Sequence, residues 1–217
     1  DYKIGSPSEV KMEKKDLLKE PVRHIDIKSF DSSKIIEAMK HMSFTARDTA
    51  KAAEILKTMI NDPDCTIMLC LAGSTSAAGC MQIYVDMVKC NMIDVIVATG
   101  ASIVDMDFFE ALGFKHYKAT QTVDDEKLRD LHIDRIYDTF IDEDQLQICD
   151  STITDIANSL PPRPYSSREF IRKMGRYLIA NAKKPDSLVQ AAYENHVPIF
   201  CPAFSDSSAG LGLVKHQ

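Results

Sequence analysis

Two uninterrupted apolar runs constrain the fold more than any other feature of this sequence. Residues 65–73 read CTIMLCLAG, and residues 92–102 read MIDVIVATGAS. A turn of small residues and then a helical pattern follow each run. Continuous apolar strands that alternate with helices are typical of a parallel sheet that is covered on both faces. The sequence therefore predicts an α/β fold, built on a parallel sheet with helices on both faces.

The rest of the chain extends this pattern in both directions. Residues 31–42 and 43–60 carry apolar residues at helical spacing, which predicts a helical N-terminal extension. A short strand or turn is expected at residues 134–141 (DRIYDTFI). Three further helices and a strand that returns to the sheet are expected over residues 142–160, 166–181, 183–196 and 197–203. We divide the chain into a polar tail, residues 1–21, and one domain, residues 22–217.

Composition excludes several classes of partner. The net charge of −6 argues against a nucleic-acid partner, because such proteins usually carry a basic patch. No apolar run reaches the roughly 20 residues that a membrane helix needs, and the first residues lack the apolar core of a secretory signal. The six cysteines include no CxxC pair and no zinc-like spacing. We therefore expect reduced thiols, no metal site, no membrane partner and a cytoplasmic location.

Three small-residue loops follow predicted strands. They are residues 73–79 (GSTSAAG), 99–102 (TGAS) and 205–210 (SDSSAG). Small residues let backbone N–H groups approach a phosphate, and parallel sheets bind ligands at the carboxyl ends of their strands. The G-x-G-x-x-G and P-loop fingerprints are absent, and each loop alone could be a simple tight turn. Three such loops together favour a nucleotide or small-ligand site.

Acidic residues near these loops are candidates for binding ribose hydroxyls or a cationic substrate. They are Asp105, Asp107 and Asp206. An acid just after a strand is also a common helix N-cap, so Asp105 alone leaves both interpretations open. The histidines show no spacing typical of a triad or a metal site.

Four segments in order resemble the deoxyhypusine synthase family, most closely its bacterial and archaeal deoxyhypusine synthase-like branch. They are CTIMLCLAGSTSAAG, NMIDVIVATGASIVDMD, DRIYDTFI and HVPIFCPAFSDSSAG. The resemblance implies a Rossmann-like NAD-binding fold and a homotetramer. It also implies NAD-dependent transfer of an aminobutyl group from spermidine, through a Schiff-base lysine, to an acceptor amine. The acceptor is a lysine of a translation factor, in the hypusine pathway, or putrescine in homospermidine-forming relatives.

The resemblance also implies site residues. The first NAD-contacting loop matches Gly73, Ser74, Thr75, Ser76 and Ala77, and the second matches Thr99, Gly100 and Ala101. Asp105 stands where a ribose-binding glutamate occurs, and Asp206 matches an NAD-contacting aspartate. Two spermidine-contacting carboxylates of the animal enzymes fall on Val104 and Leu211, which lack a carboxylate.

The family's Schiff-base lysine is not matched in this sequence. The resemblance places it beyond residue 217, which implies a chain truncated at its C-terminus and inactive by itself. Lys215 does not fit the family's lysine motif, so we assign it no catalytic role. Two alternatives remain at this point: a non-catalytic NAD-binding subunit of a hetero-oligomer, and an unrelated α/β ligand-binding domain.

Overall fold

The computed structural model describes residues 12–120 and 122–216. Its central layer is a three-stranded sheet in the order β1-β2-β6, formed by β1 (Met68–Leu71), β2 (Val95–Ala98) and β6 (Ile199–Phe200). The central strand β2 pairs in parallel with both neighbours. Its residue Ile96 is in register with Leu69 of β1 on one side and with Ile199 of β6 on the other. The chain therefore has the mixed α/β structure with a parallel sheet that its apolar runs predict.

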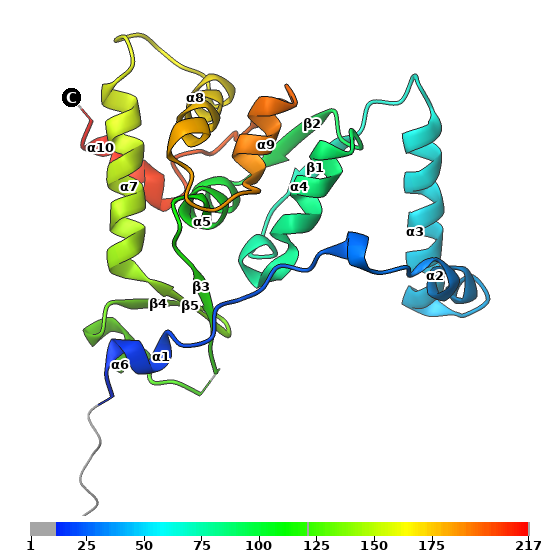
Figure 1. Cartoon of the computed structure of the whole chain (residues 1–217), viewed down its shortest axis with the longest axis horizontal. Helices are drawn as coiled ribbons and strands as arrows, with labels where there is room; N and C mark the ends of the chain where they lie inside the picture. Colours follow the sequence, from blue (N-terminus) through cyan, green and yellow to red (C-terminus); the bar gives the residue numbers. More distant parts are fainter. Residues whose placement is uncertain (1–11, 121, 217) are drawn as a thin grey trace, which may run out of the picture.

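The main core lies on one face of this sheet. Leu71, Ile96 and Ile199 are buried there and belong to one apolar cluster with residues of several helices. Among these helices are α4 (Met81–Lys89), α8 (Ser167–Asn181) and α9 (Leu188–Glu194), which lie beside the sheet in Figure 1. The helical patterns over 166–181 and 183–196 are thus confirmed, although α9 is shorter than expected.

The opposite face of the sheet is open among the described residues. Met68 is 55% exposed and Phe200 is 39% exposed, and Cys70 is exposed as well. Cys70 and Phe200 are both in register with Val97, so they share a face, and strand alternation adds Met68 to it. The prediction of helices on both faces is therefore wrong for the described part of the chain.

A second, antiparallel sheet was not expected from the sequence. It has the order β3-β5-β4, formed by β3 (His116–Lys118), β4 (Ile133–Ile136) and β5 (Thr139–Asp142). β4 and β5 form a hairpin whose turn contains Tyr137 at φ 54°. Together with α6 (Asp125–Asp130), the sheet encloses a small core of Leu128, Ile133 and Phe140. The segment predicted as one strand or turn is thus a pair of strands.

The N-terminal part forms a strap and a separate helical hairpin. After α1 (Lys14–Leu17), residues 20–25 run from β3, where Glu20 and Val22 form backbone hydrogen bonds, to Gly79, which accepts from Ile25 N, and we call them the N-terminal strap. The helices α2 (Ser33–Met39) and α3 (Phe44–Asn61) follow η1 (Ile27–Ser29). They contact each other but stand apart from the rest in Figure 1. The helical extension is confirmed; residues 1–11 lie outside the described range, and the division into tail and domain stays a prediction.

The remaining helices lie after β1, between the two sheets in chain order, and after β6. They are η2 (Ser76–Cys80), η3 (Ser102–Phe108), α5 (Phe109–Ala111), α7 (Glu143–Asn158) and α10 (Ser208–Val214). The start of α8 has a capping box, because Ser166 Oγ accepts from Glu169 N at 3.2 Å and Glu169 Oε2 accepts from Ser166 N at 3.0 Å. Within residues 12–120 and 122–216, no helix combines the length and the apolar character needed to cross a membrane.

Candidate functional site

The three small-residue loops meet at the carboxyl ends of the parallel strands. Ser102 Oγ donates to Gly73 O at 3.3 Å, which joins the first loop to the second. A Cβ atom at Gly100 would lie 2.7 Å from Ser207 Oγ and 2.9 Å from Phe204 O, so the second loop touches the third. The parallel arrangement explains this convergence, since it brings the ends of β1, β2 and β6 to one edge.

The first loop has room for polar groups of a ligand. Gly73 has φ 73°, a conformation that favours glycine, and the chain then turns tightly into η2. Ser76 Oγ is buried and has no hydrogen-bond partner among the described residues. Buried hydroxyl groups are normally paired, so an unpaired one beside a phosphate-type loop fits a ligand that supplies its partner. The neighbouring Thr75 hydroxyl instead pairs with Tyr84 Oη at 2.8 Å.

Asp105 forms part of a paired-carboxylate cluster. Ser208 Oγ lies 2.7 Å from Asp105 Oδ1 and 2.5 Å from Asp150 Oδ1. One hydroxyl has a single proton to donate, so it can satisfy only one of these carboxylates at a time. Burial raises the pKa of both Asp105 and Asp150 above the ordinary value. The cluster therefore favours a shared proton or a cationic group beside it.

Sequence reasoning missed Asp150 as a member of this cluster. It lies in the middle of α7, 45 residues after Asp105, and no loop or strand end marks it. The packing of α7 on α10 brings Asp150 to Ser208, which also bonds Asp105 of η3. Only a three-dimensional contact identifies such a residue.

Asp107 and Asp206 have different surroundings. Asp107 is 1% exposed and accepts from Ser187 Oγ at 2.7 Å, Leu188 N at 2.7 Å and Val189 N at 2.8 Å. It therefore holds the start of α9, and its assignment as a candidate ligand contact is wrong. Burial raises the pKa of the Asp107 carboxyl to about 6. Asp206 is exposed in the third loop, next to the Ser207 that meets Gly100.

A cavity of about 790 Å³ opens beside the third loop. Its lining includes Phe170, Phe204, Tyr165 and Arg163, and the two phenylalanine rings meet edge to face at 5.5 Å. Ligand pockets in proteins typically enclose roughly 300–1,000 Å³ behind mostly apolar walls. The described residues include no cluster of three or more potential metal ligands.

Comparison with known proteins identifies the family. The deoxyhypusine synthase family model matches residues 34–217. A deoxyhypusine synthase-like protein of Coxiella burnetii is 67% identical over 205 residues, which cover 94% of this chain and 58% of the relative. The corresponding protein of Caulobacter vibrioides is 64% identical over 206 residues, or 94% and 56% of the two chains. A probable deoxyhypusine synthase 2 of Methanosarcina mazei is 37% identical over 193 residues, or 89% and 56%.

The fold also resembles that of a solved structure. The crystal structure of a protein assigned as a deoxyhypusine synthase from Entamoeba histolytica matches with a TM-score of 0.61 at 16% identity, covering 89% of this chain and 66% of that one. The chain spans about 58% of the length of the Coxiella relative. The resemblance of the four sequence segments is confirmed, and the chain belongs to the deoxyhypusine synthase family.

Proposed function

We propose that this chain supplies the NAD-binding part of a deoxyhypusine synthase-like enzyme, which transfers an aminobutyl group from spermidine to an acceptor amine. The observation that carries the proposal is the meeting of three small-residue loops at one sheet edge, with the unpaired Ser76 hydroxyl beside them. Backbone N–H groups in such loops suit a pyrophosphate, and a nearby carboxylate suits ribose hydroxyls.

Each group of residues has a proposed task. The segments Gly73 to Ala77 and Thr99 to Ala101 hold the cofactor's phosphates and ribose, and Asp206 accepts hydrogen bonds from a ribose hydroxyl. When bound, NAD would accept a hydride and later return it, so the transfer has no net redox change. We assign the Schiff-base lysine to the part of the relatives that this chain does not span. The Rossmann-like character of the fold and a homotetramer remain parts of this proposal.

The carboxylate cluster is suited to the polyamine. Asp105 and Asp150 share one hydroxyl, and an ammonium group nearby would balance their charge. Asp105 thereby has a second task beside the ribose contact implied by the family. The larger cavity, whose lining includes neither aspartate, offers apolar walls around Phe170 and Phe204 that suit a methylene chain.

A second candidate acceptor is putrescine, which would give a homospermidine synthase-type reaction. Val104 and Leu211 stand where the animal enzymes carry spermidine-contacting carboxylates, and neither side chain has one. This difference in the polyamine pocket favours a small amine over a protein lysine. The aromatic-lined cavity has space for such a molecule.

Calorimetric titration of the chain with NAD tests the proposal. We expect saturable binding that weakens about tenfold in Asp206→Asn, since a hydrogen bond to a charged group contributes about 1.5–3 kcal/mol. Glu126→Gln, an exposed change on α6, is the matched control and should bind NAD normally. Absence of NAD binding, or equal affinity in both variants, would refute the assigned site. Addition of spermidine with each acceptor to the longer Coxiella relative then identifies the product.

A further inference from the structure

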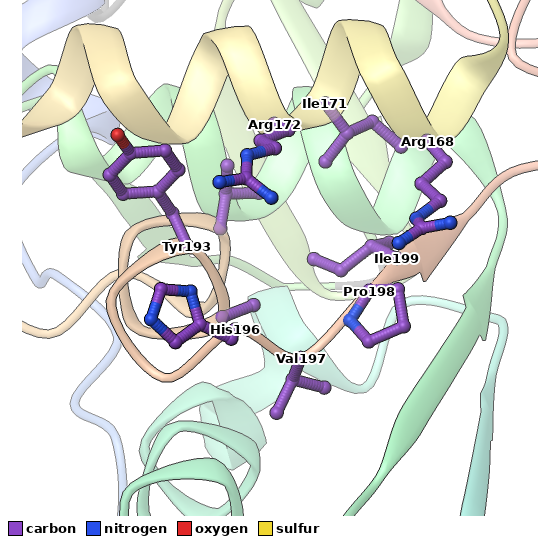
Figure 2. A pocket seen from close by; sticks show the side chains of 10 residues that line it. Arg168, Ile171, Arg172, Tyr193, His196, Val197, Pro198 and Ile199 are labelled. Carbon is purple, nitrogen blue, oxygen red and sulfur yellow. The ribbon is translucent and has the colours of Figure 1, made fainter.

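A second, smaller cavity lies at the other end of the sheet. It has a volume of about 40 Å³ and is lined by Arg168, Arg172, Tyr193, His196 and Ile199, among others. The first two belong to α8, and the others to the end of α9 and the start of β6. Figure 2 shows both guanidinium groups reaching from α8 toward the chain that carries His196 and Pro198.

This position separates the cavity from the proposed cofactor site. His196 and Pro198 precede β6, whereas the third loop follows the same strand. Since the three strands are parallel, the cavity lies toward their amino ends and the loops at their carboxyl ends. A ligand in this cavity therefore belongs to a different site.

The two arginines carry uncompensated charge. Arg168 and Arg172 are four residues apart on α8, where like charges repel each other. Neither forms an ion pair with a carboxylate in the described part of the chain, whereas the nearby Arg163 pairs with Glu169 at 2.9 Å. The one acid at the end of α9, Glu194, accepts instead from Gln190 Nε2 at 3.1 Å. The cavity is thus bordered by positive charge without an internal counter-charge.

Aromatic rings hold both guanidinium groups in place. The Arg168 guanidinium carbon lies 5.7 Å from the centre of the Phe200 ring, and that of Arg172 lies 5.7 Å from the centre of the Tyr193 ring. An arginine over a ring keeps its N–H edge available, and that edge suits the paired oxygens of a phosphate. Both arginines are exposed, so an anion from solvent can reach their N–H groups.

We propose that this cavity binds a single phosphate group, held by Arg168 and Arg172 with His196 at its rim. The small volume suits one tetrahedral anion and not a whole nucleotide. The phosphate comes either from inorganic phosphate or from a small phosphorylated molecule whose remainder stays outside the cavity.

Calorimetric titration with inorganic phosphate, in chloride buffer of constant ionic strength, tests this site. We expect saturable binding to the wild-type chain and at least a tenfold loss of affinity in the double variant R168Q/R172Q. The matched control is R176Q, an exposed change on the same helix outside the cavity lining, which should bind phosphate normally. If the double variant does not fold, the single variant R172Q replaces it.

Titrations with AMP and with acetate, compared with inorganic phosphate, distinguish the sources of the anion. Binding of AMP alone, lost in the double variant, supports a phosphate group carried by a larger molecule, whereas binding of inorganic phosphate supports the free anion. Equal binding of acetate, equal affinity in wild-type and double-variant chains, or no binding of either phosphate compound would overturn the proposal.

Discussion

Replacement of Glu110 by glutamine should destabilise the chain more than any single surface change. Glu110 is 5% exposed, and its two carboxylate oxygens lie 2.7 Å from His24 Nε2 and 2.7 Å from His116 Nδ1. Lys184 also pairs with it. Met81 N donates to His24 Nδ1 at 3.3 Å, so the proton of His24 lies on Nε2 and points to the carboxylate.

The expected loss follows from these contacts. Removing one partner of a buried charge pair costs about 3–5 kcal/mol. Glutamine keeps one carbonyl acceptor, and the Lys184 side chain is 35% exposed, so solvent screens its contribution. We therefore expect Glu110→Gln to lower the free energy of unfolding by about 3 kcal/mol, measured by urea denaturation followed by circular dichroism.

The pH dependence gives an independent check. Burial tends to raise the pKa of Glu110, but hydrogen bonds from His116 and His24 and the charge of Lys184 outweigh it and hold this pKa well below its usual range. A depressed carboxyl pKa stabilises the fold above its unfolded-state value and loses that effect as pH falls. The difference between wild type and Glu110→Gln should accordingly shrink in acid, below about pH 4.

The comparison needs two controls. Glu126→Gln removes a carboxylate from an exposed position and should change stability by less than about 0.5 kcal/mol. Combining Glu110→Gln with His24→Gln should cost less than the sum of the single changes, because the two side chains contact each other. A loss in Glu110→Gln no larger than in Glu126→Gln, at neutral pH, would refute the reasoning.

Three further outcomes follow from contacts described above. Burial raises the pKa of Asp107 to about 6. As pH rises from about 4 to about 7, the free energy of unfolding of the wild-type chain should therefore fall by up to about 3 kcal/mol relative to that of Asp107→Asn. Urea denaturation at each pH measures this difference. Gly100→Ala should weaken NAD binding and lower the melting temperature, since its Cβ would press on the Ser207 side chain and on Phe204 O. The Cβ of Gly73→Ala meets no atom within 4 Å, so its cost in stability should be that of a left-handed backbone, about 1 kcal/mol. Ser166→Ala should cost about 1 kcal/mol in the same denaturation assay through loss of the helix cap, and an unchanged midpoint would contradict it.

The parallel sheet and the meeting of its loops could be predicted because both depend on local pattern. Apolar runs at residues 65–73 and 92–102 fix β1 and β2, and parallel pairing then brings their following loops together. The antiparallel sheet could not be predicted in the same way. Its hairpin turns at Tyr137 and Asp138, without the Asn-Gly or Asp-Gly pair that usually marks such turns.

The acidic residues show a second limit of sequence reasoning. Asp105 and Asp107 follow the same strand, but residues two apart on a helical turn do not face the same side. Asp105 consequently meets Ser208, whereas Asp107 turns inward to α9. Asp150 reaches the cluster only through packing of α7 on α10, which no spacing along the chain reveals.

The N-terminal strap has a consequence for synthesis on the ribosome. It is translated before β3, yet Lys118 N donates to Glu20 O at 2.8 Å and Val22 N donates to His116 O at 2.8 Å. Glu20 and Lys118 lie 98 residues apart, a length that a ribosome needs roughly 5–20 seconds to make. During that interval the strap has no partner on β3. The strap can therefore dock on β3 only after β3 has emerged from the exit tunnel.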